Sequence, residues 1–287
     1  MQATCNIGFS RSGVGLPMID LSVVILTKNE KLHIKRCLVK LAPLDARQVF
    51  VVDCFSTDGT QDIARNAGAV VVEREWPGNQ AKQFNWALDN LPIVAAWVLR
   101  LDADEYLTDE TIMRLKTDLP NLPEDIAGLN IELKRKFRGG EICHGTNGIR
   151  QARIFRFGTG KCEDRAMDEH IVVSGGRMID YAGAFYDDSL MPFEEWKEKH
   201  RGYSKREAED AVALFANPQR LLRPSPTDLK KIMYYKLPPY FRALAYFCVR
   251  YFLKFGFLDG LAGFRWHFWQ GLWYRWLVDR EIGKHRN

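Results

Sequence analysis

Residues 99–106 read LRLDADEY and place two aspartates, Asp102 and Asp104, directly after the apolar run of residues 94–99. An apolar run of this length is typical of a buried strand, and open α/β sheets bind their ligands at the carboxyl ends of strands. If the backbone turns where the strand ends, both carboxylates can reach one divalent cation. Such hard oxygen ligands suit Mg²⁺ or Mn²⁺, usually shared with substrate phosphates. The same pattern is also typical of a solvated acidic turn, so the rest of the chain has to decide between the two.

A calcium-binding loop of the EF-hand type is excluded for this stretch. A loop that starts at Asp102 would need Gly at its sixth position and Glu at its twelfth. The chain has Leu107 and Met113 there.

The composition is that of an ordinary globular protein, with 46% hydrophobic and 27% charged residues among 287. This length allows one large α/β domain and a smaller appendage. Six scattered cysteines without a C-x-x-C pair favour a reducing compartment. The first twenty residues lack the continuous apolar core of a signal peptide, and we expect residues 1–18 to be a flexible leader.

Strand and helix patterns alternate along the first 120 residues. The strand patterns cover residues 21–26, 48–53, 69–73 and 94–101, and the helical patterns cover residues 31–41, 61–67, 80–91 and 108–117. Continuous apolar strands that alternate with helices predict a parallel sheet covered on both faces. Neither the dinucleotide-binding glycine motif nor the P-loop motif is present. Acids recur at strand ends instead, and Asp53 could accept from a ribose hydroxyl or a base N–H, or cap the helix that follows.

Four stretches in this order resemble the family 2 glycosyltransferases, which are inverting enzymes with the GT-A fold. They are LSVVILTKNE (21–30), VFVVDCFSTDGT (49–60), NQAKQFNWAL (79–88) and WVLRLDADEYL (97–107). The resemblance implies an α/β fold with a Rossmann-like, mostly parallel sheet flanked by helices. It further implies a nucleotide-sugar-binding half over residues 19–120 and an acceptor and catalytic half over residues 121–216.

The resemblance also implies roles for individual residues. The nucleotide is expected to lie against Thr27, Asn29, Glu30, Asp53 and Ser56. Lys82 or Asn85 would lie near the sugar or the phosphates. Asp102 would face the ribose and the metal, and Asp104 would coordinate the metal that holds the diphosphate.

A second acidic cluster occupies residues 162–170, which read CEDRAMDEH. An inverting transfer needs a carboxylate that removes the acceptor hydroxyl proton. In the family that base is an acid of the second half, in an E-D pair or beside a late His-Glu pair. The chain offers Glu163 and Asp164, and also Asp168 and Glu169 in the order DEH, which departs from the family pattern. We predict Asp168 as the base and Glu169 next; a salt-bridged surface turn is the alternative.

His170 closes this cluster and precedes the apolar residues 171–173. It could be a third metal ligand beside Asp102 and Asp104, or a contact of the diphosphate. A single histidine beside an apolar strand is also typical of a structural role, so the sequence leaves these roles open.

The rest of the chain contains further elements and a change in composition. Expected are strands at 128–133 and 151–157, a basic loop at 134–145, a charged helix at 194–215 with a possible break at Gly202, and a linker at 217–226. Residues 228–287 carry a net charge of +7, from eleven Lys/Arg and four Asp/Glu, and hold 17 of the 35 aromatic residues. A basic, aromatic tail on a near-neutral body indicates an anionic partner.

The final stretch, residues 217–287, is predicted to be a linker and an aromatic, basic helical extension. Arg242, Tyr246, Arg250 and Lys254 recur every four residues and form one stripe of a helix. These charges exclude a membrane-spanning helix, whereas a basic stripe beside an aromatic surface fits a helical hairpin on an anionic leaflet. Packing of the aromatics against the catalytic domain is the alternative.

Together these features predict a metal-dependent inverting glycosyltransferase, cytoplasmic and peripherally bound to the inner face of the cytoplasmic membrane. Its donor would be a nucleotide diphosphate sugar, and its acceptor a hydroxyl of a lipid-linked, lipopolysaccharide or exopolysaccharide glycan, with Mn²⁺ or Mg²⁺ as cofactor. A polyprenyl-phosphate glycosyltransferase, whose phosphate nucleophile needs no strong base, is one alternative. A nucleic-acid-binding protein that uses the tail is another, but aliphatic residues and Phe dominate the tail helix, so no nucleic acid is expected.

Overall fold

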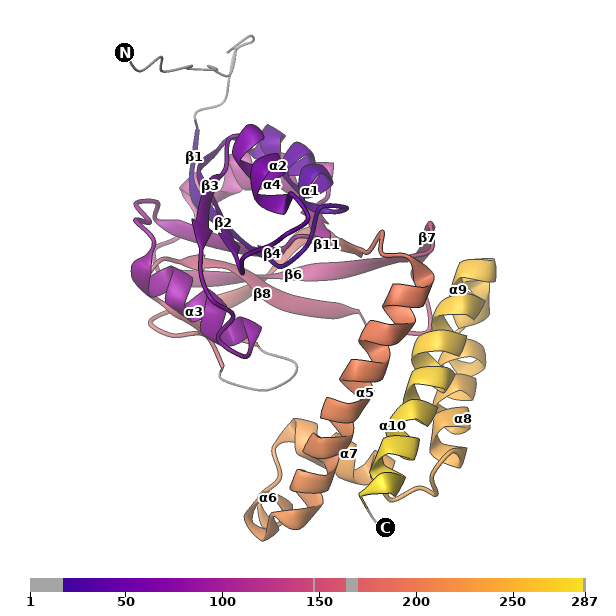
Figure 1. Cartoon of the computed structure of the whole chain (residues 1–287). Helices are drawn as coiled ribbons and strands as arrows, with labels where there is room; N and C mark the ends of the chain where they lie inside the picture. Colours follow the sequence, from indigo (N-terminus) through magenta and orange to yellow (C-terminus); the bar gives the residue numbers. More distant parts are fainter. Residues whose placement is uncertain (1–17, 147, 164–169, 286–287) are drawn as a thin grey trace.

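The computed structural model describes residues 18–146, 148–163 and 170–285, and it shows a twisted sheet with a helical extension below one end (Figure 1). The first half of the sheet domain contains β1 (Ile19–Thr27), α1 (Ile34–Leu41), η1 (Ala42–Leu44), β2 (Ala46–Asp53), α2 (Thr60–Asn66), β3 (Val70–Glu73), α3 (Gln80–Asn90), β4 (Trp97–Asp102), β5 (Glu105–Leu107), α4 (Asp109–Asp118) and η2 (Leu119–Asn121). The predicted elements of this half are all present, with ends displaced by up to three residues.

Strand β1 lies at the centre of the parallel part of the sheet, in the order β3-β2-β1-β4. Successive side chains of a strand point to opposite faces. Val23 and Ile25 accordingly join the hydrophobic core under α1, whereas Val24 and Leu26 join the core under α3. Both faces of the strand are buried, and the prediction of a parallel sheet covered on both sides is confirmed.

The second half of the sheet contains β6 (Ile126–Phe137), β7 (Gly140–Ile142), β8 (Ile149–Arg156), β9 (Gly160–Cys162), β10 (Ile171–Val173) and β11 (Arg177–Asp188). The order continues β4-β8-β6-β11-β5, with β9 and β10 as a separate hairpin. Strand β8 is antiparallel to both neighbours, whereas β11 runs parallel to β6 over a long register. The sheet is therefore mixed and mostly parallel.

The loop expected over residues 134–145 is wrong, because β6 continues to Phe137 and β7 turns back to pair with it. The long basic side chains of this segment pack on aromatic rings. Lys136 lies 4.4 Å from the ring centre of Tyr186, and Arg135 lies 4.8 Å from that of Trp266. The strand can therefore carry these cations, because the aromatic rings cover the alkyl parts of the lysine and arginine side chains.

The helical extension contains α5 (Phe193–Ala216), α6 (Pro218–Leu222), α7 (Pro226–Tyr235), α8 (Phe241–Cys248), the π-helical η3 (Val249–Leu253), η4 (Gly256–Asp259), α9 (Gly260–Trp266), the π-helical η5 (His267–Trp273) and α10 (Tyr274–Lys284). The long helix α5 descends from the sheet and packs along α10 (Figure 1). Within the described part of the chain, no helix is both long and apolar enough to cross a membrane.

Two expectations for this region are wrong. Helix α5 runs through Gly202 without a break, since the glycine has helical backbone angles and lies on an exposed face. The linker at 217–226 contains α6, because the Asn217 side chain caps it and Pro218 starts it.

Two of the three cations of the tail stripe, Arg242 and Arg250, face the protein interior and not a membrane as predicted, whereas Lys254 is exposed. Arg242 and Arg250 are only 2% and 8% exposed. Arg242 forms an ion pair with Asp279 of α10, and Arg250 donates to the carbonyl oxygen of Gly145 at 3.1 Å. The arginines are buried because they find acceptors inside, and they hold the extension together and against the sheet.

Candidate active site

The carboxyl ends of β1 and β2 are tied together by the carboxylate of Asp53. It accepts hydrogen bonds from Thr27 at 2.6 Å, from the backbone and hydroxyl of Ser56 at 2.7 and 2.6 Å, and from Gln61 at 2.7 Å. Although burial opposes ionisation, the hydrogen bonds from Ser56 and Thr27 lower the pKa of Asp53. This network fixes the turn between β2 and α2.

The turn that follows β1 is bound to the same network. The backbone N–H of Asn29 donates to the Ser56 hydroxyl at 2.7 Å, and the Asn29 side chain accepts from the Thr57 backbone at 2.9 Å. Asn29 has a φ of 56°, which asparagine adopts more readily than most residues. The predicted nucleotide-binding residues Thr27, Asn29, Asp53 and Ser56 therefore lie in one cluster, with the Asp53 carboxylate inside it. Their contact with a nucleotide stays a prediction.

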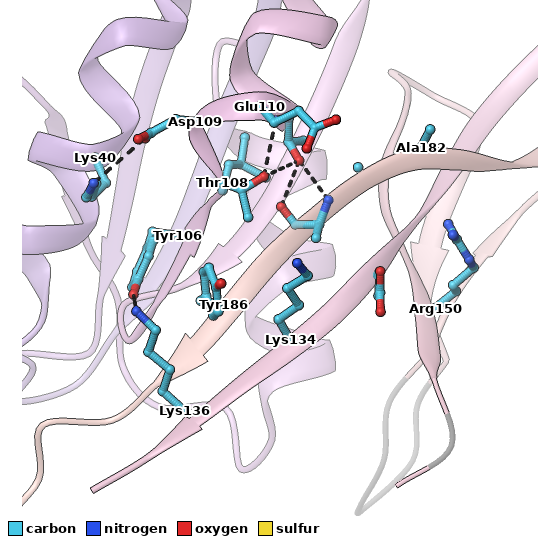
Figure 2. Close-up of a pocket in the computed structure, with 15 residues that line it drawn as sticks. Lys40, Tyr106, Thr108, Asp109, Glu110, Lys134, Lys136, Arg150, Ala182 and Tyr186 are labelled. Atoms are coloured by element: carbon cyan, nitrogen blue, oxygen red, sulfur yellow. Dashed lines mark hydrogen bonds and ion pairs between the residues drawn. The ribbon is translucent and has the colours of Figure 1, made fainter. Parts of the chain in front are cut away.

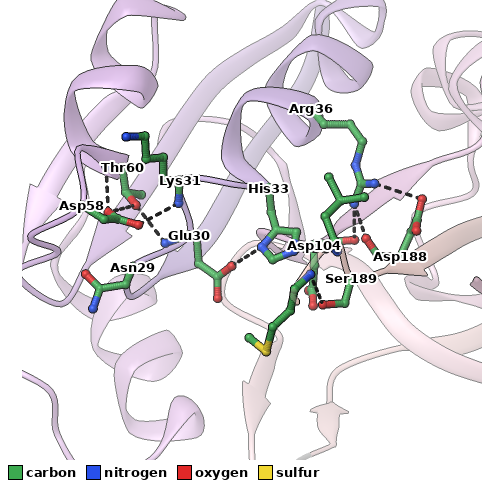
Figure 3. Close-up of polar contacts among 12 residues, drawn as sticks. Asn29, Glu30, Lys31, His33, Arg36, Asp58, Thr60, Asp104, Asp188 and Ser189 are labelled. Atoms are coloured by element: carbon green, nitrogen blue, oxygen red, sulfur yellow. Dashed lines mark hydrogen bonds and ion pairs between the residues drawn. The ribbon is translucent and has the colours of Figure 1, made fainter. Parts of the chain in front are cut away.

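Glu30 and helix α1 connect this cluster with the end of β11 (Figure 3). The carboxylate of Glu30 lies 2.5 Å from Nδ1 of His33, and Nε2 of His33 accepts from the backbone of Leu190 at 2.9 Å. Nδ1 therefore carries the proton that is donated to Glu30. Arg36 donates to Asp188 at 3.0 Å. The end of β11 is thereby held beside the turns of β1 and β4.

A buried ion pair shapes the turn after β4. The Glu105 carboxylate accepts from the backbone of Asp102 at 2.9 Å and from Arg153 of β8 at 2.5 Å. The Oδ1 atom of Asp102 is buried and accepts no hydrogen bond from the described residues, and it lies 3.7 Å from Nη2 of Arg100. A buried carboxylate oxygen without a hydrogen bond requires an explanation, and a metal ion or a ligand donor would satisfy it.

Asp104 lies in a concentration of negative charge. Burial, together with the charges of Asp187 and Asp102, raises its pKa to about 7, and Lys199 opposes this effect. Carboxylates that lie close together repel one another, and a bound cation offsets this repulsion.

The two aspartates of the D-x-D stretch line different cavities. The cavity at Asp102 has a volume of about 380 Å³ and is also lined by Gln80, Arg100, Asn130, Arg153 and His170. The cavity at Asp104 has a volume of about 240 Å³ and is also lined by Asp187, Trp196, Lys199, His200 and Trp266. A ligand that bridges the two cavities would pass over both carboxylates.

The residues present fit a divalent cation that is shared with a phosphorylated ligand. Within residues 18–146, 148–163 and 170–285, no group of three His, Cys, Asp or Glu side chains comes together as a metal site. Mg²⁺ is commonly bound by one or two carboxylates together with substrate phosphates, so Asp102 and Asp104 suffice for such a site. His170 is exposed and lines the same cavity as Asp102, and its role as a ligand stays a prediction.

Lys82 and Asn85, predicted near the sugar or phosphates, lie on the first turns of α3. Lys82 is exposed, and its backbone donates to the capping side chain of Asn79. Asn85 exchanges two hydrogen bonds, of 2.9 and 2.8 Å, with the backbone of Cys162. The structure therefore gives Asn85 a positioning role at β9.

Asn85 holds the entry to the predicted base segment. The backbone of Glu163, which is half-buried, donates to the carbonyl oxygen of His170 at 2.9 Å, so the two ends of the segment lie together. Asp164, Asp168 and Glu169 lie outside the described residues. The choice of the base among these four acids stays a prediction.

The structure adds residues to the candidate site that were not predicted from the sequence. Asp187 and Asp188 end β11, and Lys199 comes from α5. Asp187 pairs with Arg135 at 3.0 Å and lines the Asp104 cavity. The sequence signal that could have identified Asp187 is an acid at the end of a strand pattern, as for Asp53 and Asp102.

A larger cavity of about 530 Å³ lies beside Tyr106, between β6, β11 and α4 (Figure 2). Lys134 and Lys136 line it together with Glu110 and Glu132, so its charges are mixed. Lys136 donates to the Tyr106 hydroxyl at 3.1 Å, and this hydroxyl donates to Asp188 at 3.0 Å. We assign this cavity no ligand.

Comparisons with known proteins identify the class to which this fold and site belong. The profile of Glycosyl transferase family 2 matches residues 22–174, which is more than half of the chain. The chain belongs to the family 2 glycosyltransferases. The predicted GT-A class of fold is thereby confirmed.

Related sequences align over part of their length. A glycosyltransferase of Rickettsia typhi is 38% identical over 94 residues, which make up 32% of this chain and 30% of that protein. A TPR repeat-containing protein of Synechococcus elongatus is 31% identical over 146 residues, 50% of this chain and 33% of that protein. The chain thus matches about a third of the length of these relatives.

Two solved enzymes are similar over less than half of this chain. Glucosyl-3-phosphoglycerate synthase from Mycobacterium tuberculosis, crystallised with Mn²⁺, UDP and glucosyl-3-phosphoglycerate, is 24% identical, with a TM-score of 0.32 and coverage of 46% of this chain and 51% of that one. Mannosyl-3-phosphoglycerate synthase from Rubrobacter xylanophilus is 19% identical, with a TM-score of 0.35 and coverage of 42% of each chain.

Proposed function

We propose that this glycosyltransferase moves a sugar, with inversion, from a nucleotide diphosphate donor to a hydroxyl of a lipid-linked, lipopolysaccharide or exopolysaccharide acceptor. The observation that carries the proposal is the pair Asp102 and Asp104, at the carboxyl end of a central strand, between two cavities and beside Asp187. Carboxylates at this place in an α/β sheet lie where such sheets bind ligands.

The donor is assigned to the first half of the sheet, residues 19–120. The nucleotide would lie over the cluster of Thr27, Asn29, Asp53 and Ser56, with Glu30 beside it. From there the diphosphate would extend toward Asp102. Mn²⁺ or Mg²⁺ bound at Asp102 and Asp104 would offset the negative charge that develops on the departing diphosphate.

The acceptor is assigned to the second half, residues 121–216. Its hydroxyl oxygen forms the new bond to the anomeric carbon while the bond from that carbon to the diphosphate oxygen breaks. A carboxylate takes the hydroxyl proton, and Asp168 remains our first candidate, followed by Glu169, Glu163 and Asp164. Asp187 is a further carboxylate that lines the Asp104 cavity.

The place of action is proposed to be the inner face of the cytoplasmic membrane. Residues 217–287, the C-terminal part of the extension, are both basic and aromatic, and an acceptor carried by a lipid would be presented there. Nucleic acid is not proposed as a partner.

A panel of nucleotide diphosphate sugars tests the proposal. Each is added with and without Mn²⁺, and the unfolding temperature and the release of nucleoside diphosphate are measured. We expect one donor to raise the unfolding temperature in a metal-dependent way, and the product formed from it to have the opposite anomeric configuration. A folded protein that responds to no donor would contradict the proposal.

A further inference from the structure

Several large apolar side chains are exposed along the segment where α8 leads through η3 and η4 into α9. Those called the apolar face below are Phe252, Leu253, Phe255, Leu258, Leu261 and Phe264, each between 42% and 72% exposed. The ring of Tyr251 lies within 6 Å of the rings of both Phe252 and Phe264, which joins the two ends of the group. Soluble monomers rarely expose large side chains in one contiguous patch, and such patches commonly mark interaction sites.

The exposed charges of the segment that carries the apolar face are positive. Lys254 and Arg265 are exposed within it. Between residues 236 and 266 the sequence has a single acid, Asp259. Its side chain is 4% exposed and accepts hydrogen bonds from the backbones of Cys143 and His144. The surface therefore presents cations beside apolar groups, without an accessible acid in this segment.

The apolar face is attached firmly to the sheet domain. The backbone of Gly145 donates to the carbonyl oxygen of Lys254 at 2.8 Å, and Arg250 donates back to Gly145. Beneath the face, the fully buried ring of His267 fills the space beside Gly145 and Gly256, where a Cβ atom would lie within 2.5 Å of it. A surface that binds through this face would therefore orient the catalytic domain as well.

Helix α9 connects this face with the site. Leu261 and Phe264 are exposed on one side of the helix. Trp266 packs on Phe137 with ring centres 5.3 Å apart and lines the cavity that contains Asp104. The same short helix thus carries the apolar face and a wall of the candidate active site.

We propose that the apolar face docks on an anionic lipid bilayer, with its Phe and Leu side chains at the boundary of headgroups and acyl chains and with Lys254 and Arg265 among the lipid phosphates. Charge complementarity favours this occupant, because the segment that carries the apolar face exposes cations and no acid, which matches an anionic leaflet. The inference rests on the proposed function solely for the use of the site by a lipid-linked acceptor. Binding itself needs neither donor nor acceptor.

Vesicle flotation with the full chain tests this inference. The probes are vesicles of phosphatidylglycerol and phosphatidylethanolamine, and vesicles of phosphatidylcholine alone. We expect binding to the anionic vesicles that is at least about tenfold tighter than to the neutral ones and that weakens with added salt. We expect the double variant Leu253→Glu with Leu261→Glu to lose at least about tenfold in affinity, since each leucine contributes a large apolar surface.

A matched control places the same charges elsewhere. Val94 and Met113 are 60% and 61% exposed on the sheet domain, and Val94→Glu with Met113→Glu is expected to bind like the unmodified chain. Unchanged unfolding temperatures in both double variants show that each is folded.

Three results would overturn the inference. They are no binding to anionic vesicles, equal loss in both double variants, or conversion of a dimer to a monomer by the leucine variant without vesicle binding, which would make the apolar face a self-association surface. Because flotation contains no nucleotide sugar, its failure is separate from a failure of the donor panel.

Discussion

The sheet domain and the helical extension both bury charged side chains, but they arrange them differently. At the carboxyl ends of the strands, burial and the negative charges of Asp187 and Asp102 raise the pKa of Asp104. In the extension, the buried carboxylate of Asp279 is matched by Arg242. Unbalanced charge costs folding free energy, whereas a matched pair largely avoids that cost.

This difference distinguishes the candidate active site of the sheet domain from the structural ion pair of the extension. An arrangement that disfavours folding is retained where a ligand compensates it, and functional groups are often found at such places. The paired arginine of the extension instead holds two helices in register. Substitutions should therefore have opposite consequences in the two regions, affecting activity in one and stability in the other.

Asp104→Asn gives the largest expected effect. Removal of one proposed metal ligand should lower sugar transfer by about 10³-fold or more, which corresponds to about 4 kcal/mol of transition-state stabilisation. Because the substitution also removes a like charge, the unfolding temperature of the metal-free protein should stay the same or rise. Rates of donor turnover and thermal unfolding measure the two effects.

The control for this variant is Asp109→Asn. The Asp109 side chain is 83% exposed, and it forms an ion pair with Lys40 at 3.7 Å. Its loss should leave both rate and stability unchanged. Full activity of Asp104→Asn would remove the metal site from the proposal.

Asp279→Ala should act on stability. The variant leaves the buried Arg242 guanidinium without its carboxylate, which should lower the free energy of unfolding by about 3 kcal/mol. A donor sugar should still raise the unfolding temperature of this variant in a metal-dependent way. Denaturant unfolding gives the first quantity and thermal shift the second.

Glu198→Ala is the matched control in the extension. Glu198 pairs with Arg201 on the exposed side of α5, at 2.7 Å and with 72% of its side chain exposed. An exposed pair of this kind contributes well under about 1 kcal/mol. Equal destabilisation by Asp279→Ala and Glu198→Ala would show that the buried ion pair contributes no more stability than an exposed one.

The same contrast explains which features the sequence predicts. The order of strands and helices to residue 118 follows from continuous apolar runs and from helical spacing, because both faces of that sheet are covered. The acids at strand ends could be found because they follow apolar runs directly. Asp187 was not predicted, because β11 has a mixed burial pattern and was not recognised as a strand.

Long-range pairing is the part that the sequence did not reveal. The spacing of Arg242 and Arg250 was correct as a helical stripe, but a stripe does not say which side faces water. That depends on Asp279, which lies 37 residues further along the chain, and on the carbonyl oxygen of Gly145 in the sheet domain. The exposed apolar face is the opposite side of the same arrangement.

Stability should depend on pH through a buried histidine of the extension. Burial and the neighbouring charge of Arg250 lower the pKa of His267 to about 4, below the ordinary value near 6.5 of an unfolded chain. The unfolded state therefore binds more protons between these values. The stability that His267 contributes is fully present above about pH 6.5 and is lost as the pH falls toward 4, by roughly 1 kcal/mol between pH 7.5 and 5.5.

Unfolding in denaturant at several pH values measures this slope. His267→Gln should flatten it, whereas His285→Gln, at an exposed position near the end of α10, should leave it as it is. A slope that survives in His267→Gln would assign the pH dependence to other groups.

The smallest expected effects come from one substitution made in both regions, Gly→Ala at open positions. A Cβ atom at Gly59 or at Gly202 would meet nothing within 4 Å, so packing does not distinguish them. Their backbones do, because Gly59 has a φ of 91° in the turn before α2 and Gly202 is helical. Gly59→Ala should lower the free energy of unfolding by about 1 kcal/mol, and Gly202→Ala should raise it by up to about 1 kcal/mol. Denaturant unfolding checks both signs, and a destabilising Gly202→Ala would mean that α5 bends at this residue, as its sequence first suggested.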